Sequence, residues 1–146
     1  MVLRKFKIIK LLEVNLLFTK NFKPLLISYI LVLFLLNVLP INGKESALNN
    51  NYFLHIRWDY LGHSLLLIPL FPLIYLSFKK SSLFKISILL PITISLLVAI
   101  STEFIQYFIS WRTFNVNDLF ANIIGVFFGV VGIFAVVNLK RKLRVI

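Results

Sequence analysis

The chain of 146 residues contains no cysteine and only five acidic residues. The lack of cysteine excludes disulfide bonds, thiolate metal sites and cysteine nucleophiles. Only 14% of the residues are charged and 60% are hydrophobic, whereas about a quarter of a typical soluble domain is charged. The length suggests one domain, and so much apolar surface must face something other than water. The sequence therefore predicts an integral membrane protein.

The basic residues outnumber the acidic ones and give a net charge of +11. They occur in short clusters between apolar spans, and the sequence carries no RNA-binding, helix-turn-helix or zinc-finger pattern. In a membrane protein such clusters set the orientation and attract anionic lipid. We therefore expect the lipid bilayer as a partner, no nucleic acid and no cofactor. The oligomeric state is left open.

Apolar spans in four places predict transmembrane helices. Pro24 suits the start of the first span, Pro40 suits its end, and Pro69 with Pro72 predicts a kink in the second. The fold class is all-α, an integral membrane four-helix bundle in residues 23–139. The expected helices cover residues 24–40, 58–78, 84–109 and 118–139.

The distribution of Lys and Arg predicts the orientation. Of the sixteen such residues, thirteen fall on the side of the two termini and three on the other, so both termini are expected on the cytoplasmic side of the membrane. Residues 1–22 mix lysine with Ile, Leu and Phe, which is typical of a short interfacial helix. Residues 140–146 are expected to form a basic cytoplasmic tail.

Polar residues in the last three spans meet at the outer end of the predicted bundle. Residues three or four apart share one helix face, and three of the five acids of the chain lie in this pattern. A charge facing lipid costs roughly 2.5–3.5 kcal/mol at a helix centre, so these side chains should face one another or a wet cavity. The expected ligand-binding residues are Asp59, His63, Glu103, Gln106, Arg112, Asp118 and Asn122.

Four motifs in this order also resemble a known family. They are D-Y-L-G-H from Asp59 to His63, E-F-I-Q from Glu103 to Gln106, W-R-T-F around Arg112, and D-L-F-A-N-I-I-G-V-F-F-G from Asp118 to Gly129. Together they are similar to the VanZ-like family of bacterial integral membrane proteins, over roughly residues 30–138. Departures occur at Tyr60, Ser64 and Ser110-Trp111, where the family often has Lys, an aromatic residue and Pro-Gly.

The resemblance implies a role in the cell envelope. The member that gives the family its name is associated with resistance to the glycopeptide antibiotic teicoplanin. A link between this chain and tolerance of such antibiotics is therefore an expectation from the resemblance alone.

Several of these residues also have structural interpretations. Arg112 lies on the loop between the last two spans and can pair with Glu103 or Asp118, and the structural interpretation of this group is an ion-pair network that pins two helix ends. Asp118 also suits the first turn of a helix capped by Asn117. Gly125 and Gly129 are expected to serve helix packing. A metal site made of His63, Asp59, Glu103 and Asp118 is the weakest interpretation, and no metal is predicted.

Four functions compete. The first is an envelope binding or accessory protein whose outer pocket recognises a lipid head group or lipid-linked precursor. The second is a membrane-embedded enzyme with Glu103, His63 and Asp59 as candidate acid–base residues. Ser64 and Ser101 lack a nucleophile motif. A small transporter and a pure scaffold are the remaining alternatives, so whether the chain is an enzyme is left open.

Overall fold

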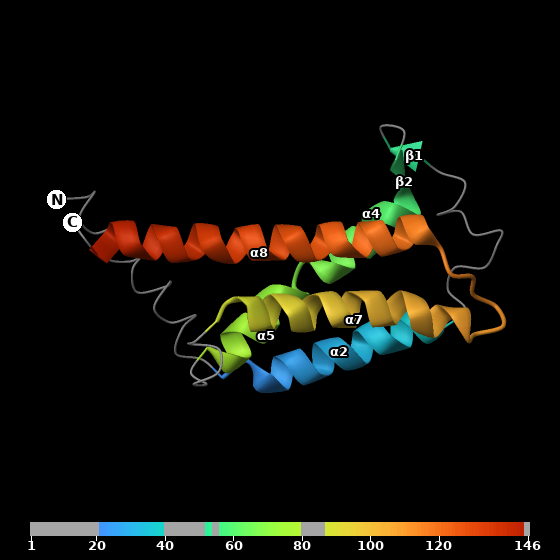
Figure 1. Cartoon of the computed structure of the whole chain (residues 1–146), viewed down its shortest axis with the longest axis horizontal. Coiled ribbons are helices and arrows are strands. Elements are labelled where there is room, and N and C mark those ends of the chain that lie inside the picture. Colours follow the sequence, from blue (N-terminus) through green and yellow to red (C-terminus); the bar gives the residue numbers. More distant parts are fainter. Residues whose placement is uncertain (1–20, 40–51, 54–55, 80–86, 145–146) are drawn as a thin grey trace.

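The computed structural model describes residues 21–39, 52–53, 56–79 and 87–144 (Figure 1). The predicted interfacial helix therefore lies almost entirely outside the described residues. The helices are α2 (Lys23–Val38), α4 (Trp58–Leu67), α5 (Leu70–Phe78), α7 (Leu89–Tyr107) and α8 (Val116–Arg144). A short antiparallel pair, β1 (Tyr52–Phe53) and β2 (Ile56–Arg57), precedes α4.

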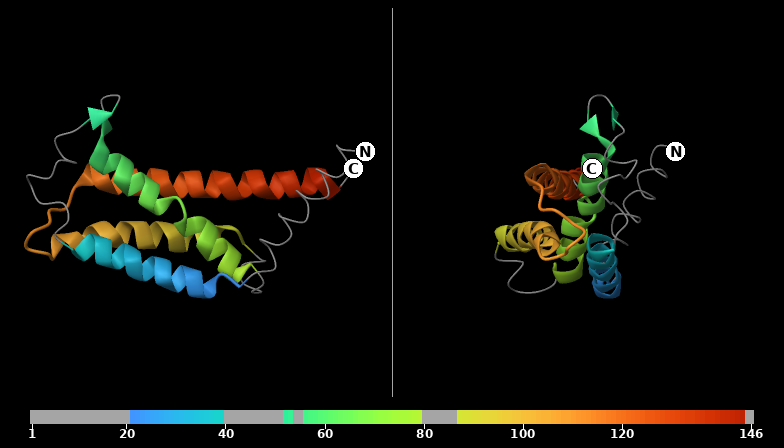
Figure 2. Two further views of the ribbon diagram at one scale, coloured as in Figure 1. Left: turned by 180° about the vertical axis from the view of Figure 1, so that it is seen from behind. Right: turned by 90° about the vertical axis from the view of Figure 1, so that its right-hand side faces the viewer.

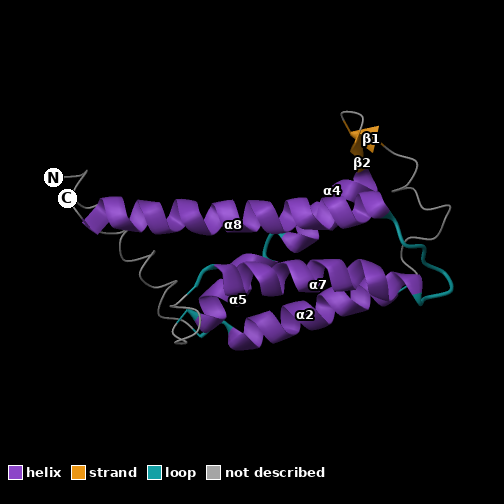
Figure 3. Ribbon diagram, viewed as in Figure 1, coloured by secondary structure: helices purple, strands orange, loops and turns teal. Residues whose placement is uncertain are grey.

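The helices run alternately up and down along one long axis (Figures 1 and 2). Helices α4 and α5 together make one leg of the bundle, and α2, α7 and α8 make the others (Figure 3). Three segments are long and apolar enough to cross a membrane, namely Trp58–Phe78, Leu89–Tyr107 and Val116–Leu143. Helix α2 is shorter, with 16 residues. The prediction of an all-α membrane four-helix bundle is confirmed.

The second leg bends between Leu67 and Leu70, as its prolines predict. Pro69 has no backbone N–H to donate, and the helix is interrupted at Ile68 and Pro69. Pro72 lies in the first turn of α5, where the missing N–H removes no hydrogen bond. The break lets α4 and α5 take different directions (Figure 2).

Helix α8 is longer than the predicted span. It begins at Val116 and continues through the basic residues to Arg144. Residues 140–144, which were expected to belong to the basic tail, are therefore part of α8. Helix α7 is shorter than predicted at its start, where α7 begins at Leu89 and residues 80–86 lie outside the described residues.

The bundle is closest packed where α8 crosses the break in the second leg. A Cβ atom on Gly125 would overlap the carbonyl oxygen of Ser64, and one on Gly129 would overlap that of Ile68. Below this crossing Leu67, Leu70 and Phe71 are at most 2% exposed. The two glycines thus permit a backbone approach that no larger residue allows.

The alternating directions gather four helix termini at one end of the bundle. The C-terminal ends of α2 and α7 lie there beside the N-terminal ends of α4 and α8 (Figure 1). This end also holds most of the buried polar side chains, and it is called the polar end below.

Candidate functional site

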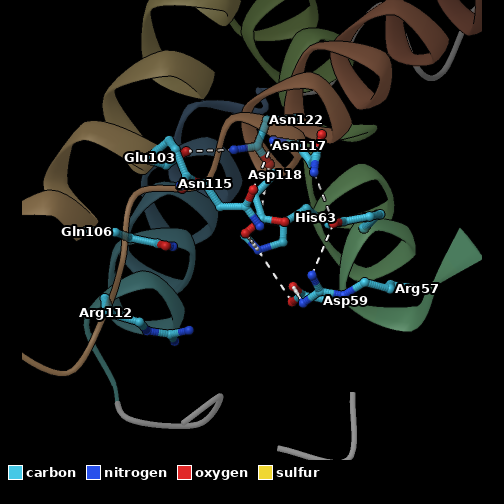
Figure 4. A network of polar contacts seen from close by, with 12 residues as sticks. Arg57, Asp59, His63, Glu103, Gln106, Arg112, Asn115, Asn117, Asp118 and Asn122 are labelled. Carbon is cyan, nitrogen blue, oxygen red and sulfur yellow. Dashed lines mark hydrogen bonds and ion pairs between the residues drawn. The ribbon is translucent and has the colours of Figure 1, made fainter. Parts of the chain in front are cut away.

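Three buried carboxylates lie at the polar end (Figure 4). The exposed fractions are 7% for Asp59, 0% for Glu103 and 6% for Asp118. They come from the first turn of α4, the last turns of α7 and the first turn of α8, so the structure brings together the polar faces that the sequence predicts. Burial of this kind requires each charge to have a compensating partner.

His63 lies between two of these carboxylates. Its Nε2 atom is 3.8 Å from Oδ1 of Asp59 and 3.9 Å from Oδ2 of Asp118. Its other ring nitrogen, Nδ1, is 3.2 Å from Oδ1 of Asn122. Asp59 reaches the ring because it precedes His63 by one helical turn. Asp118 and Asn122 reach it from α8.

The surroundings of Asn122 decide which nitrogen of His63 carries the proton. Nδ2 of Asn122 is 3.4 Å from the carbonyl oxygen of Ala99 and 3.3 Å from Oγ1 of Thr102. The Thr102 hydroxyl already donates its hydrogen to the Ala99 carbonyl at 2.8 Å. Both neighbours therefore accept hydrogen bonds from the amide. This orientation leaves Oδ1 facing His63, so Nδ1 is the donor and carries the hydrogen.

Arg57 forms an ion pair with Asp59, and the sequence analysis counted it only among the three basic residues that assign orientation. Its Nη2 atom donates to Oδ2 of Asp59 at 3.1 Å, and Nη1 donates to the Tyr60 hydroxyl at 3.0 Å. The guanidinium also lies 4.7 Å from the centre of the Tyr60 ring. Its position two residues before Asp59, at the helix start, was the signal that the sequence offered.

Glu103 contacts the loop between α7 and α8. Its Oε1 atom accepts a hydrogen bond of 2.8 Å from the backbone N–H of Asn115. Oε2 is buried and has no hydrogen-bond partner among the described residues. The side chain of Asn115 accepts from the backbone N–H of Asn117 at 3.0 Å. The cap of α8 is therefore Asn115, and the prediction of Asn117 was wrong because the helix begins at Val116.

Arg112 does not pair with Glu103 or Asp118 in the described part of the chain, so the expected ion pair was wrong. Its Nη2 atom donates to the carbonyl oxygens of Leu36 at 3.1 Å and Leu39 at 2.7 Å. The last carbonyl groups of a helix have no partners within it and attract cations. The carbonyl groups at the end of α2 are therefore the partners of Arg112. The sequence analysis did not include them because it considered only polar side chains of the last three spans.

Gln106 also contacts α2. Its Nε2 atom donates to Oδ1 of Asn37 at 2.6 Å, and Nδ2 of Asn37 donates to the Leu33 carbonyl at 2.8 Å. Asn37 is 8% exposed. The sequence analysis missed this residue, although a lone polar side chain inside an apolar span is a signal of an interior position.

A pocket of about 310 Å³ is lined by Asp59 and His63, which contact α8 and Arg57, and by Gln106 and Arg112, which contact α2. In Figure 4, Gln106 and Arg112 lie across from Asp59, and all three residues line the pocket. The polar lining is completed by His63, Asn122 and Asn37, and the apolar lining comes from α2 and α4. Trp58 and Leu65 line it as well and are 45% and 65% exposed. The pocket therefore combines a mostly apolar lining with a few polar side chains, and part of the apolar lining is exposed.

The seven predicted ligand-binding residues thus divide into three groups. Asp59, His63 and Asp118 each offer a ligand atom, and these atoms lie within 4.8 Å of one another. Gln106, Arg112 and Asn122 line the pocket together with Asp59 and His63. Glu103 belongs neither to the three ligand residues nor to the pocket lining. Its carboxylate instead accepts a hydrogen bond from the α7–α8 loop.

Comparison with known proteins identifies the family. A family model described as VanZ/LLP1 matches residues 9–138, which is most of the chain. No curated protein and no solved structure matches. The polar residues of the motifs that carry the resemblance meet at the polar end, and Gly125 and Gly129 lie where α8 crosses the second leg. The chain belongs to the VanZ/LLP1 family and is a membrane protein.

Proposed function

We propose that the chain is a binding or accessory protein of the bacterial cell envelope, and that the pocket holds the head group of an anionic lipid or lipid-linked precursor. The observation that carries this proposal is the composition of the pocket. Most of its lining is apolar, including the exposed residues Trp58 and Leu65, and polar side chains such as Arg112 and His63 line the rest. An amphipathic molecule can place its head group against the polar side chains and its chain along the apolar ones.

The charge of Arg112 favours an anionic head group. Among the described residues, this guanidinium is bonded to the carbonyl oxygens of Leu36 and Leu39 and to no carboxylate. Neutral carbonyls satisfy hydrogen bonds without cancelling the charge. A guanidinium has five donors and binds phosphate or carboxylate strongly. Arg112 would therefore meet the anionic group at the pocket wall.

The distribution of basic residues supports an outward-facing pocket. With both termini in the cytoplasm of a bacterial cell, the polar end lies at the outer face of the cytoplasmic membrane. This placement is compatible with an envelope lipid as ligand. It is also compatible with a link to teicoplanin-type tolerance, the property associated with the member that names the family.

A structural role is the alternative that a specific observation favours. Arg112 and Gln106 fasten α7 and its loop to α2, and Nε1 of Trp111 donates to the Val38 carbonyl at 3.0 Å. Such contacts hold a bundle together whether or not a ligand is present. The experiment must therefore change the pocket without touching these contacts.

Native mass spectrometry of the detergent-purified protein provides this test. Phosphatidylglycerol and phosphatidylcholine with equal chains are offered to the wild type, Leu61→Trp and Leu97→Trp. Leu61 lines the pocket, whereas Leu97 is 59% exposed and lies outside it. We expect the wild type and Leu97→Trp to retain phosphatidylglycerol preferentially, and Leu61→Trp to lose it. Equal retention of both lipids, or by all three proteins, would favour the structural role.

A further inference from the structure

We propose that Asp59, His63 and Asp118 bind one divalent transition-metal ion of the zinc type at the polar end. The sequence analysis predicted no metal, because the candidate ligands are scattered along the chain. The structure gathers three of them, and their ligand atoms lie within 4.8 Å of one another. The proposal concerns the ion alone and holds whatever molecule occupies the pocket.

The spacing of the three atoms suits a metal centre after a small contraction. Zn²⁺ binds histidine nitrogen and carboxylate oxygen at about 2.0–2.2 Å in tetrahedral geometry, which places neighbouring ligand atoms about 3.4 Å apart. Nε2 of His63 is 3.8 Å from Asp59 Oδ1 and 3.9 Å from Asp118 Oδ2. All three ligand atoms lie within 4.8 Å of one another, so binding of an ion requires the three side chains to move closer together.

The protonation of His63 gives independent support. Nδ1 donates to Asn122, so in the neutral ring Nε2 presents a lone pair to two carboxylates. Three acceptors then face one another with no donor between them. A cation between the three atoms satisfies all of them.

Asp118 points to the same conclusion. Its side chain is 9% exposed, and Oδ1 is buried without a hydrogen-bond partner in the described part of the chain. Oδ2 of Asp59 accepts a hydrogen bond from Arg57, and Oδ1 of Asp59 is 3.8 Å from Nε2 of His63. Buried carboxylates are paired or coordinate metals. Each acid thus keeps an oxygen available for an ion.

The ligand set selects the class of metal. Imidazole nitrogen suits zinc and its neighbours in the first transition row, whereas Mg²⁺ prefers six oxygen ligands in octahedral geometry. The histidine is also held as metal ligands usually are, with its second nitrogen donating to an oxygen, here that of Asn122. Three protein ligands leave a fourth position open. Because Asp59 and His63 line the pocket, that position is accessible from it.

Calorimetric titration of the chelator-treated full chain with Zn²⁺ in detergent tests the proposal. We expect one ion per chain, and a loss of affinity of about 100-fold or more in His63→Gln and Asp118→Asn, since even residues that only orient metal ligands contribute about 10–100-fold. The matched controls are His55→Gln and Glu45→Gln, which remove the other histidine and an acid that are not among the three proposed ligands. Both should bind zinc as the wild type does.

A second measurement avoids variants that fail to fold. Wild-type protein loaded with Co²⁺ should show the intense visible absorption of a tetrahedral site, and one equivalent of Zn²⁺ should abolish it. No stoichiometric uptake by the wild type, or equal affinity in the wild type and Asp118→Asn, would overturn the proposal. Lipid retention is measured on metal-free protein. The lipid proposal and the metal proposal can therefore fail independently of each other.

Discussion

Nε2 of Gln106 in α7 donates a hydrogen bond of 2.6 Å to Oδ1 of Asn37 in α2. Both side chains are buried, with exposed fractions of 3% and 8%. The pair joins α2 to α7 at the wall of the pocket. Because both side chains are almost completely buried, Oδ1 of Asn37 and Nε2 of Gln106 depend on each other for a hydrogen-bond partner.

Removing one member of this pair should therefore cost more than removing both. We expect Gln106→Leu to lower the free energy of unfolding by about 1–3 kcal/mol, because it leaves Oδ1 of Asn37 unsatisfied. The double variant with Asn37→Leu should lose less than the sum of the single variants. Thermal unfolding in detergent measures all four proteins, and strict additivity would show that the two side chains act independently.

A second prediction concerns Glu103, whose Oε1 holds the backbone N–H of Asn115. Glu103→Gln keeps an oxygen for this bond and removes a buried charge, so it should change the free energy of unfolding by less than about 1 kcal/mol. Glu103→Leu leaves the N–H without its acceptor and should lose about 1–3 kcal/mol. Thermal unfolding distinguishes the two. If both variants were equally destabilised, the charge and not the hydrogen bond would be the important property.

The sequence predicted the helical spans and the gathering of polar residues because both follow from periodicity. Asp59 and His63 share a face in any α-helix, and the alternating directions of the helices bring Asp118 beside them. The kink at Pro69 likewise follows from local chemistry, since proline lacks the backbone donor. These features need no knowledge of how distant segments pack.

The partners of Arg112 could not be predicted in this way. Opposite charges favoured Glu103 or Asp118, but the loop carries the guanidinium to the end of α2, where Leu36 and Leu39 present unpaired carbonyl groups. The path of a loop and the position of a helix end depend on tertiary packing. The contacts of Arg57 with Asp59 and Tyr60 are local, two and three residues apart, so the sequence did offer a signal for them.

A third prediction tests the close approach of α8 to the second leg. Gly125→Ala should lower the free energy of unfolding by about 1–3 kcal/mol, because the added methyl group overlaps the Ser64 carbonyl and forces the helices apart. Gly132→Ala is the matched control on the same helix, since no described atom lies within 4 Å of the added methyl group. It should be neutral or slightly stabilising in thermal unfolding. Equal losses in both variants would mean that alanine harms α8 wherever it is placed.

The last prediction concerns orientation, and the absence of cysteine makes it simple to test. Thr113 is exposed in the loop at the polar end, and Lys142 is exposed near the opposite end of α8. In intact cells, a membrane-impermeant maleimide should label Thr113→Cys and should label Lys142→Cys only after the cells are permeabilised. The cysteine-free parent protein controls for background labelling. The reverse pattern would place the pocket at the cytoplasmic face. The basic clusters near the termini would then lie outside, against the usual distribution of charge, and an extracytoplasmic lipid could not reach the site.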